Sequence, residues 1–171
     1  MTPGLAVGPG GVERLGMDGS VTRDMPVLLM RAEFTPKSID AERRTAEVVF
    51  STGSRVLRGG WFSDPYWEEL SLEPKHVRMG RLNNGAPLLD AHNGYSLDAV
   101  IGVVEDASVD GKRGTATIRF AKDERSEKVW QKVRDGILQN ISVGYRVHKL
   151  ETTDKGDPEA KKWPVRLAVD W

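Results

Sequence analysis

Apolar and polar positions alternate along much of the chain, which predicts a protein built mainly from β-strands. In residues 114–120 the side chains of Ala116, Ile118 and Phe120 fall on every second position, as in a strand with one buried face. Further strands are predicted at residues 26–34, 45–51, 86–89, 99–104, 141–148 and 164–171. A turn region separates the first two of these strands, so we expect them to form a hairpin.

One helix is predicted, over residues 123–135. Asp123 is a suitable N-cap residue, and Val129 and Val133 share a face because they are four positions apart. Gly136 stands where a C′ glycine commonly ends a helix. The protein is therefore expected to be α+β but mainly β.

Two segments, residues 1–24 and 53–84, do not show the alternation of apolar and polar positions. In residues 53–84, aromatic side chains stand among Gly, Pro and charged residues, and a single helical turn is predicted at residues 65–70. Residues 1–24 are rich in glycine and poor in large apolar groups, so they cannot offset the entropy of ordering. We therefore predict a flexible leader over residues 1–24 and a single domain over residues 25–171.

Composition narrows the classes of function. Lys plus Arg and Asp plus Glu both number 25, so no overall positive field favours nucleic acid or an anionic membrane, and neither partner is expected. The chain has no cysteine, which excludes disulfides, thiolate catalysis and zinc–thiolate or iron–sulfur sites. The longest apolar run, residues 25–30, is far shorter than the ~20 residues of a membrane helix.

A general base acting near neutral pH has few candidates, because the chain has three histidines. His92 follows the predicted strand 86–89, where apolar residues end in a polar, Gly-containing loop. An imidazole at a strand end is held by the sheet and is still open to a substrate. The alternative is an exposed loop histidine with no chemical role.

Ser142 is the candidate nucleophile. It lies in the predicted strand 141–148, shortly after the helix, and Gly144 removes the next side chain from the same face, so a substrate backbone could approach the hydroxyl. The alternative is a serine on the solvated face of an edge strand. No Gly-x-Ser-x-Gly sequence surrounds it, which argues against an α/β-hydrolase. A nucleophilic serine needs a base, and only tertiary structure can bring His92 to it.

Two motifs in a fixed order carry a family resemblance. The chain contains Pro-Leu-Leu-x-x-His at residues 87–92, a strand with Val-Ile-Gly at 100–102, a helix, and Gly-Ile-Leu-x-x-Ile-Ser-Val-Gly-Tyr-Arg-Val at 136–147. This combination looks like the prohead maturation proteases of tailed bacteriophages, over about residues 31–150. The resemblance implies a fold like that of the herpesvirus assembly proteases, a mostly antiparallel β-barrel flanked by helices with the nucleophile on a strand.

The resemblance also implies a function and a site. By this likeness the protein is a serine endopeptidase that cleaves phage scaffold and major capsid proteins, and itself, inside the assembling prohead in the host cytoplasm. Ser142 matches the family's nucleophile and His92 its catalytic histidine, and no metal or organic cofactor is implied. The family usually continues past a strand like residues 165–171, so we expect a chain shortened at its C-terminus.

A third group should orient His92 and stabilise its imidazolium. The herpesvirus relatives use a second histidine, but His148 lies on the predicted strand of Ser142, about 20 Å further along it. We favour Asp170 on the last predicted strand. Asp90 is the runner-up, because it lies two positions before His92 on the same extended segment, and Asp98 is also near in the sequence.

Two further hypotheses concern association. On the same fold, the chain would act as a noncatalytic module that binds capsid or scaffold proteins, with Ser142 and His92 incidental. Separately, Val129 and Trp130 are adjacent in the predicted helix, which makes its apolar face broader than a helix covering a sheet requires. This width predicts a weak homodimer that pairs through the helix.

Overall fold

The computed structural model describes residues 13–15, 21–23, 28–34, 38–60, 63–153 and 162–171. Two short strands, β1 (Glu13–Leu15) and β2 (Val21–Arg23), form an antiparallel pair. The remainder of the predicted leader lies outside the described residues.

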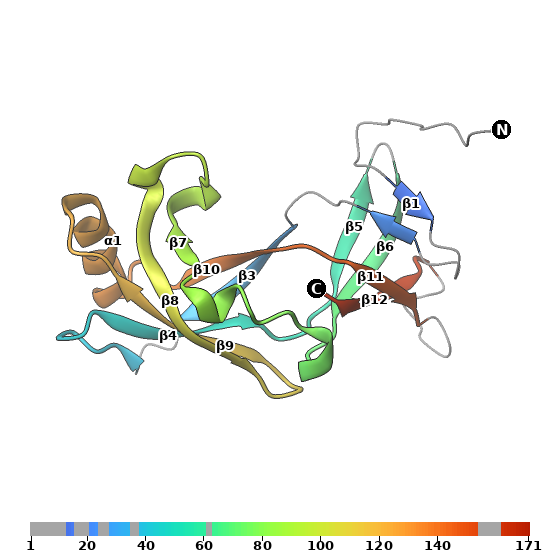
Figure 1. The fold of residues 1–171 in the computed structure, drawn as a ribbon, viewed down its shortest axis with the longest axis horizontal. Coiled ribbons are helices and arrows are strands. Elements are labelled where there is room, and N and C mark those ends of the chain that lie inside the picture. The colour runs from blue at the N-terminus through green and yellow to red at the C-terminus, as the bar shows by residue number, and fades with distance from the viewer. Residues whose placement is uncertain (1–12, 16–20, 24–27, 35–37, 61–62, 154–161) are drawn as a thin grey trace.

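Six antiparallel strands form the larger sheet (Figure 1). Their order across the sheet is β10-β3-β4-β9-β8-β7. The strands are β3 (Leu28–Phe34), β4 (Thr45–Ser51), β7 (Pro87–Leu89), β8 (Val100–Val109), β9 (Gly114–Phe120) and β10 (Asn140–Tyr145). The predicted hairpin between the first two is confirmed, because Glu33 and Phe34 of β3 pair antiparallel with Val49 and Val48 of β4.

A second sheet has four strands in the order β11-β12-β6-β5. They are β5 (Val56–Gly60), β6 (Ser63–Leu70), β11 (Lys149–Thr152) and β12 (Val165–Asp170). The helical turn predicted at residues 65–70 is wrong, because these residues belong to β6. Tyr66, Glu68 and Leu70 are buried at every second position, but the charge of Glu68 and the proline before Tyr66 conceal the alternation in the sequence.

The predicted helix is confirmed as α1 (Glu124–Arg134). The Asp123 side chain accepts hydrogen bonds from the Ser126 backbone N–H at 3.0 Å and from the Ser126 hydroxyl at 2.6 Å, and Gly136 adopts a left-handed φ of 70°. Short 3₁₀ helices complete the described structure: η2 (Pro74–His76), η3 (Leu82–Asn84), η4 (Asp90–His92) and η5 (Leu97–Ala99).

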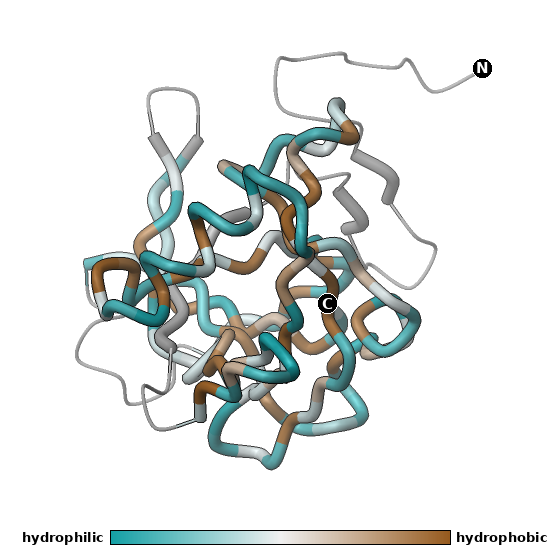
Figure 2. Tube along the Cα trace, turned by 90° about the vertical axis from the view of Figure 1, so that its left-hand side faces the viewer, coloured by the Kyte–Doolittle hydropathy of each residue, from teal (hydrophilic) through white to brown (hydrophobic). Residues whose placement is uncertain are grey.

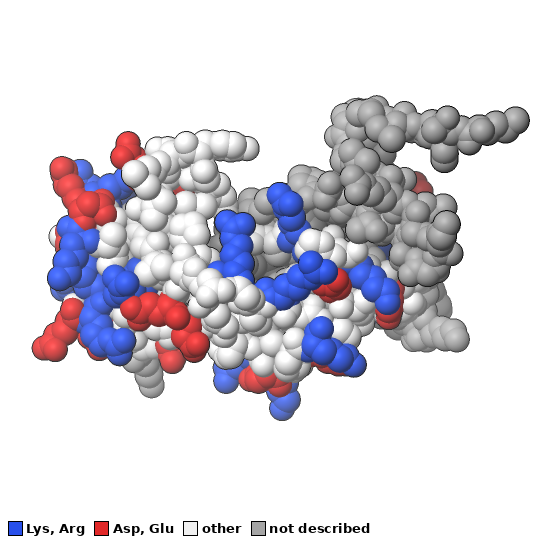
Figure 3. All heavy atoms as spheres, viewed as in Figure 1, with Lys and Arg blue, Asp and Glu red and all other residues white. Residues whose placement is uncertain are grey.

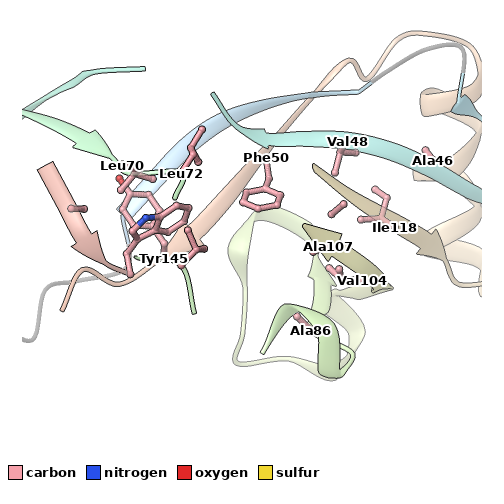
Figure 4. Close-up of a cluster of buried hydrophobic side chains, with 14 of the residues drawn as sticks. Ala46, Val48, Phe50, Leu70, Leu72, Ala86, Val104, Ala107, Ile118 and Tyr145 are labelled. Carbon is pink, nitrogen blue, oxygen red and sulfur yellow. The ribbon is translucent and has the colours of Figure 1, made fainter. Parts of the chain in front are cut away.

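The core joins the two sheets. Hydrophobic and hydrophilic segments alternate along much of the Cα trace (Figure 2). The buried side chains gather in two groups with Phe50 between them (Figure 4). One group, on the six-stranded sheet, includes Val48 and Ile118. The other includes Leu70 and Tyr145, and connects β6 with β10.

The helix face that predicted a homodimer is covered within the chain. Trp130 is 1% exposed, its ring centroid lies 5.2 Å from that of Phe120, and the Arg44 guanidinium lies 5.5 Å from its ring centroid. Val133 is also buried. The structure therefore removes the basis for pairing through α1.

The predicted barrel is not closed. The larger sheet has β10 at one edge and β7 at the other, and no strand pairing joins these edges among the described residues. In the part of the chain that the structure describes, one α-helix, α1, contacts the sheet, through β8 and β9, where several flanking helices were expected. The fold is α+β and mainly β, with antiparallel pairing throughout the larger sheet.

Gly102 on β8 is a point of close backbone approach. A Cβ atom at this position would lie 2.2 Å from the carbonyl oxygen of Arg119 on β9. Gly102→Ala is therefore expected to push the two central strands apart and to lower the free energy of unfolding by about 2 kcal/mol. Chemical denaturation checks this, with Gly80→Ala as the control, because nothing lies within 4 Å of a Cβ atom at Gly80. Equal stability of the two variants would contradict the prediction.

Candidate functional site

A strained turn presents His92. The residue ends η4, immediately after β7, and both Ala91 and His92 have left-handed backbone conformations, with φ of 51° and 55°. Two consecutive non-glycine residues in this region are unfavourable and persist only where the surrounding structure holds them. The turn directs the half-buried imidazole back across the sheet.

Ser142 lies in the middle of β10, an edge strand that pairs with β3. The predicted difference between the two faces of this segment is confirmed at residues 144–147, whereas Ile141, Ser142 and Val143 are all half-buried. Tyr145 and Val147 are buried, whereas Gly144 is exposed and Ser142 is half-buried. Ser142 therefore shares its strand face with the exposed Gly144, and its own side chain is partly open to solvent.

The structure brings Ser142 and His92 together. The Ser142 Oγ and His92 Nε2 atoms form a hydrogen bond between residues that are 50 positions apart, and with Nε2 unprotonated the hydroxyl is the donor. The edges of a flat six-stranded sheet would lie about 24 Å apart. The sheet must therefore curl strongly, so that the turn after one edge strand touches the other edge strand. The Ser142–His92 hydrogen bond thus connects the two edges of the sheet, which a closed barrel would connect by strand pairing.

Neither favoured carboxylate is hydrogen-bonded to His92. The two carboxylate oxygens of Asp170 accept from Nε and Nη2 of Arg78 at 2.5 and 2.6 Å, and β12 belongs to the four-stranded sheet. Asp90 accepts from Arg125 of α1 at 2.6 Å. In the part of the chain that the structure describes, no hydrogen bond reaches Nδ1 of His92. The observed site is a serine–histidine pair.

His148 and Arg166, a histidine and an arginine late in the chain, lie away from the Ser142–His92 pair. The backbone N–H of His148 donates to the Asp170 carbonyl at 2.7 Å, which places His148 beside β12. The Arg166 guanidinium lies 4.4 Å from the Tyr66 ring centroid. Arg166 therefore contacts the four-stranded sheet.

A second serine–histidine pair was not predicted. The hydroxyl of Ser71 and Nδ1 of His76 lie 2.7 Å apart, but Ser71 is buried. The indole N–H of Trp171 donates to the Ser71 carbonyl at 2.8 Å. Because a substrate cannot reach the Ser71 hydroxyl, this pair serves as an internal comparison for Ser142.

A buried polar network ties β10, the strand that carries Ser142, to the second sheet. The Tyr145 hydroxyl donates to Oε1 of Glu68, Nη2 of Arg58 donates to the Tyr145 hydroxyl at 2.6 Å, and Nε of Arg58 donates to Oε1 of Glu68 at 3.1 Å. The Glu68 side chain has no exposed area. Burial, and then the hydrogen bond to Glu68, raise the pKa of Tyr145. The network attaches β10 to β6 at Tyr145, three positions after Ser142. In the sequence, its one sign is a glutamate, Glu68, that stands between the apolar positions 66 and 70.

Asp170→Asn is expected to remove part of the acid dependence of stability. The hydrogen bond from Arg78 holds the pKa of Asp170 below its usual range, so the folded protein binds this proton less readily than the unfolded chain. The stabilisation is therefore present at neutral pH and is lost as the pH falls below about 4. Urea unfolding between pH 7 and pH 3 checks this. A difference between variant and parent that does not shrink toward pH 3 would contradict it.

Part of the chain is similar in sequence to a phage capsid protein. It is 38% identical over 86 residues to the major capsid protein of Halomonas phage phiHAP-1, a match that covers 50% of this chain and 14% of that protein. No protein-family model matches the chain, and no solved structure matches it.

The helices and the acidic and histidine side chains of the described residues bear on other classes of site. None of the helices there is both long and apolar enough to cross a membrane. No group of three or more His, Cys, Asp or Glu side chains in the same residues is placed to hold a metal ion.

Proposed function

We propose that the protein is a serine endopeptidase of phage head maturation, with Ser142 as nucleophile and His92 as general base. The observation that carries this proposal is the hydrogen bond between the Ser142 hydroxyl and Nε2 of His92, the contact that activation of a serine requires. Its position on an accessible strand face and the strained turn that holds His92 support the same assignment.

The chemistry is acyl transfer. Ser142 Oγ forms a bond to the scissile carbonyl carbon while its proton passes to Nε2 of His92, and the imidazolium then gives that proton to the amine as the C–N bond breaks. Water repeats the two steps to release the acyl group. Because Asp90 and Asp170 are both paired with arginines, the reaction is assigned to a dyad.

The capsid similarity supports the biological setting. The matched relative is named a major capsid protein of a phage, which supports a role in the phage head. We assign the substrates as scaffold and major capsid proteins, together with the chain itself, cleaved inside the prohead in the host cell. In this proposal, these cleavages convert the prohead into the mature head.

A second candidate is a noncatalytic module that binds capsid or scaffold chains. Two observations favour it: the matched relative is a capsid protein, and Nδ1 of His92 has no partner among the described residues. On this hypothesis the serine–histidine hydrogen bond only joins the two edges of the sheet. The two candidates differ in whether the Ser142 oxygen is nucleophilic.

A fluorophosphonate reagent tests nucleophilicity without a known substrate. An activated Ser142 oxygen forms a bond to phosphorus and expels fluoride, so the parent is expected to carry one adduct on the peptide that contains Ser142. The adduct should be absent in Ser142→Ala and reduced at least about tenfold in His92→Ala. Ser71→Ala should label like the parent. An unlabelled parent, beside a labelled trypsin control, would favour the noncatalytic module.

A further inference from the structure

The strand that carries Ser142 continues into an arginine for which the described residues supply no partner. Beyond β10 the alternation of burial persists: Tyr145 and Val147 are buried, and Gly144 and Arg146 are exposed. Arg146 therefore lies on the side of Ser142, with no side chain between the two at position 144. In the described part of the chain Arg146 has no ion pair or hydrogen bond.

Most other arginines there are paired. Those in ion pairs with Asp or Glu are Arg43, Arg44, Arg55, Arg58, Arg78, Arg113, Arg119 and Arg125. A guanidinium with five donors in a fixed fork is well suited to a carboxylate from another chain.

Lys and Arg side chains also gather at one place on the surface, although the same face carries Asp and Glu side chains elsewhere (Figure 3). Figure 3 shows a hollow near the middle of one face, with Lys and Arg side chains around it. In the same view β10 runs through the middle of the molecule (Figure 1). The outer edge of β10 pairs with no other strand in the described residues, so its backbone is available to an added extended segment.

We propose that Arg146 selects substrates that carry an aspartate or glutamate near the scissile bond, an inference that rests on the proposed function. A polypeptide lying along β10 places its reacting carbonyl at Ser142 and passes over the bare Gly144. Arg146 lies about 13 Å beyond Ser142 at about 3.3 Å per residue. The acidic side chain is thus about three to five residues from the scissile bond.

The ligand is a peptide and not a nucleic acid. A single guanidinium beside a free strand edge suits one carboxylate on an extended backbone, whereas a nucleic acid needs a run of phosphate contacts. The zero net charge of the chain agrees with this. A nucleic-acid ligand is therefore one of the outcomes that would overturn the proposal.

Cleavage profiling is the first test. The parent is incubated with a proteome-derived peptide library, and cleavage sites are read by mass spectrometry. Asp and Glu should be enriched about three to five residues from the cut. Arg146→Glu should lower cleavage of these peptides at least about tenfold and shift the preference toward Lys and Arg, and Arg146→Lys should keep much of the acidic preference. Lys112→Glu, an equal charge change in the exposed β8–β9 turn, should behave like the parent.

Binding separates this proposal from the proposed function. The Ser142→Ala protein is titrated with fluorescein-labelled twelve-residue peptides that differ only by Glu or Gln at one position. Tighter binding of the Glu peptide, lost on adding Arg146→Glu, supports the role of Arg146 even if the parent cleaves nothing, and in that case only the proposed function fails. Equal binding of the two peptides, an unchanged profile in Arg146→Glu, or displacement of the Glu peptide by oligo-dT would overturn the proposal.

Discussion

Ser142→Ala is expected to lower peptide cleavage by at least about 10⁴-fold. In the proposed mechanism the hydroxyl is the group that attacks the carbonyl, and His92 has no other nucleophile among its hydrogen-bond partners in the described part of the chain. The substitution deletes one oxygen from a half-buried position on an edge strand, so the free energy of unfolding should change by less than about 1 kcal/mol. Cleavage of the peptide library and chemical denaturation measure the two effects.

The buried pair provides the control for this experiment. Ser71→Ala removes a hydroxyl that is also bound to a histidine, but Ser71 is buried and cannot meet a substrate. This variant should keep the parental cleavage pattern and lose stability instead. If Ser142→Ala cleaves the same peptides at the parental rate, the nucleophile assignment is wrong.

Arg58→Met is expected to lower the free energy of unfolding by about 3–5 kcal/mol. It removes the cation beside the Glu68 carboxylate, which has no exposed area, and it removes the donor to the Tyr145 hydroxyl. An unpaired charge then remains between β6 and β10, at a point where Oε2 of Glu68 already has no hydrogen-bond partner among the described residues. Urea denaturation at pH 7 measures the loss.

A more exposed pair nearby gives the control. Arg55, which directly precedes β5, forms an ion pair with Glu69 of β6 at 3.0 Å, and each side chain is 34% exposed. Arg55→Met should therefore cost less than about 1 kcal/mol. Adding Glu68→Gln to Arg58→Met should recover part of the lost stability, because no charge then remains buried. Equal losses in Arg55→Met and Arg58→Met would show that the buried network contributes little to stability.

Local patterns in the sequence predicted most of the secondary structure. The alternation in residues 45–51 and 114–120 coincides with β4 and β9, because each strand buries one face. Asp123 and Gly136 marked the ends of α1, because capping depends on a few neighbouring residues. The strand β6 was missed, because one of its buried positions is Glu68, and a hydrophobic pattern does not reveal a charge neutralised by a distant arginine.

The sequence by itself also indicated Ser142 and His92. Ser142 lies on a predicted strand with Gly144 two positions later, and His92 lies in a polar loop after an apolar strand. Only the tertiary structure decided that the two meet, because their contact depends on the curl of a six-stranded sheet. It also decided that Asp170 binds Arg78, because β12 joins β6 in the other sheet. Local residues determine where a strand or helix begins and ends, whereas the partners of a side chain depend on which strands pair and how the sheets bend.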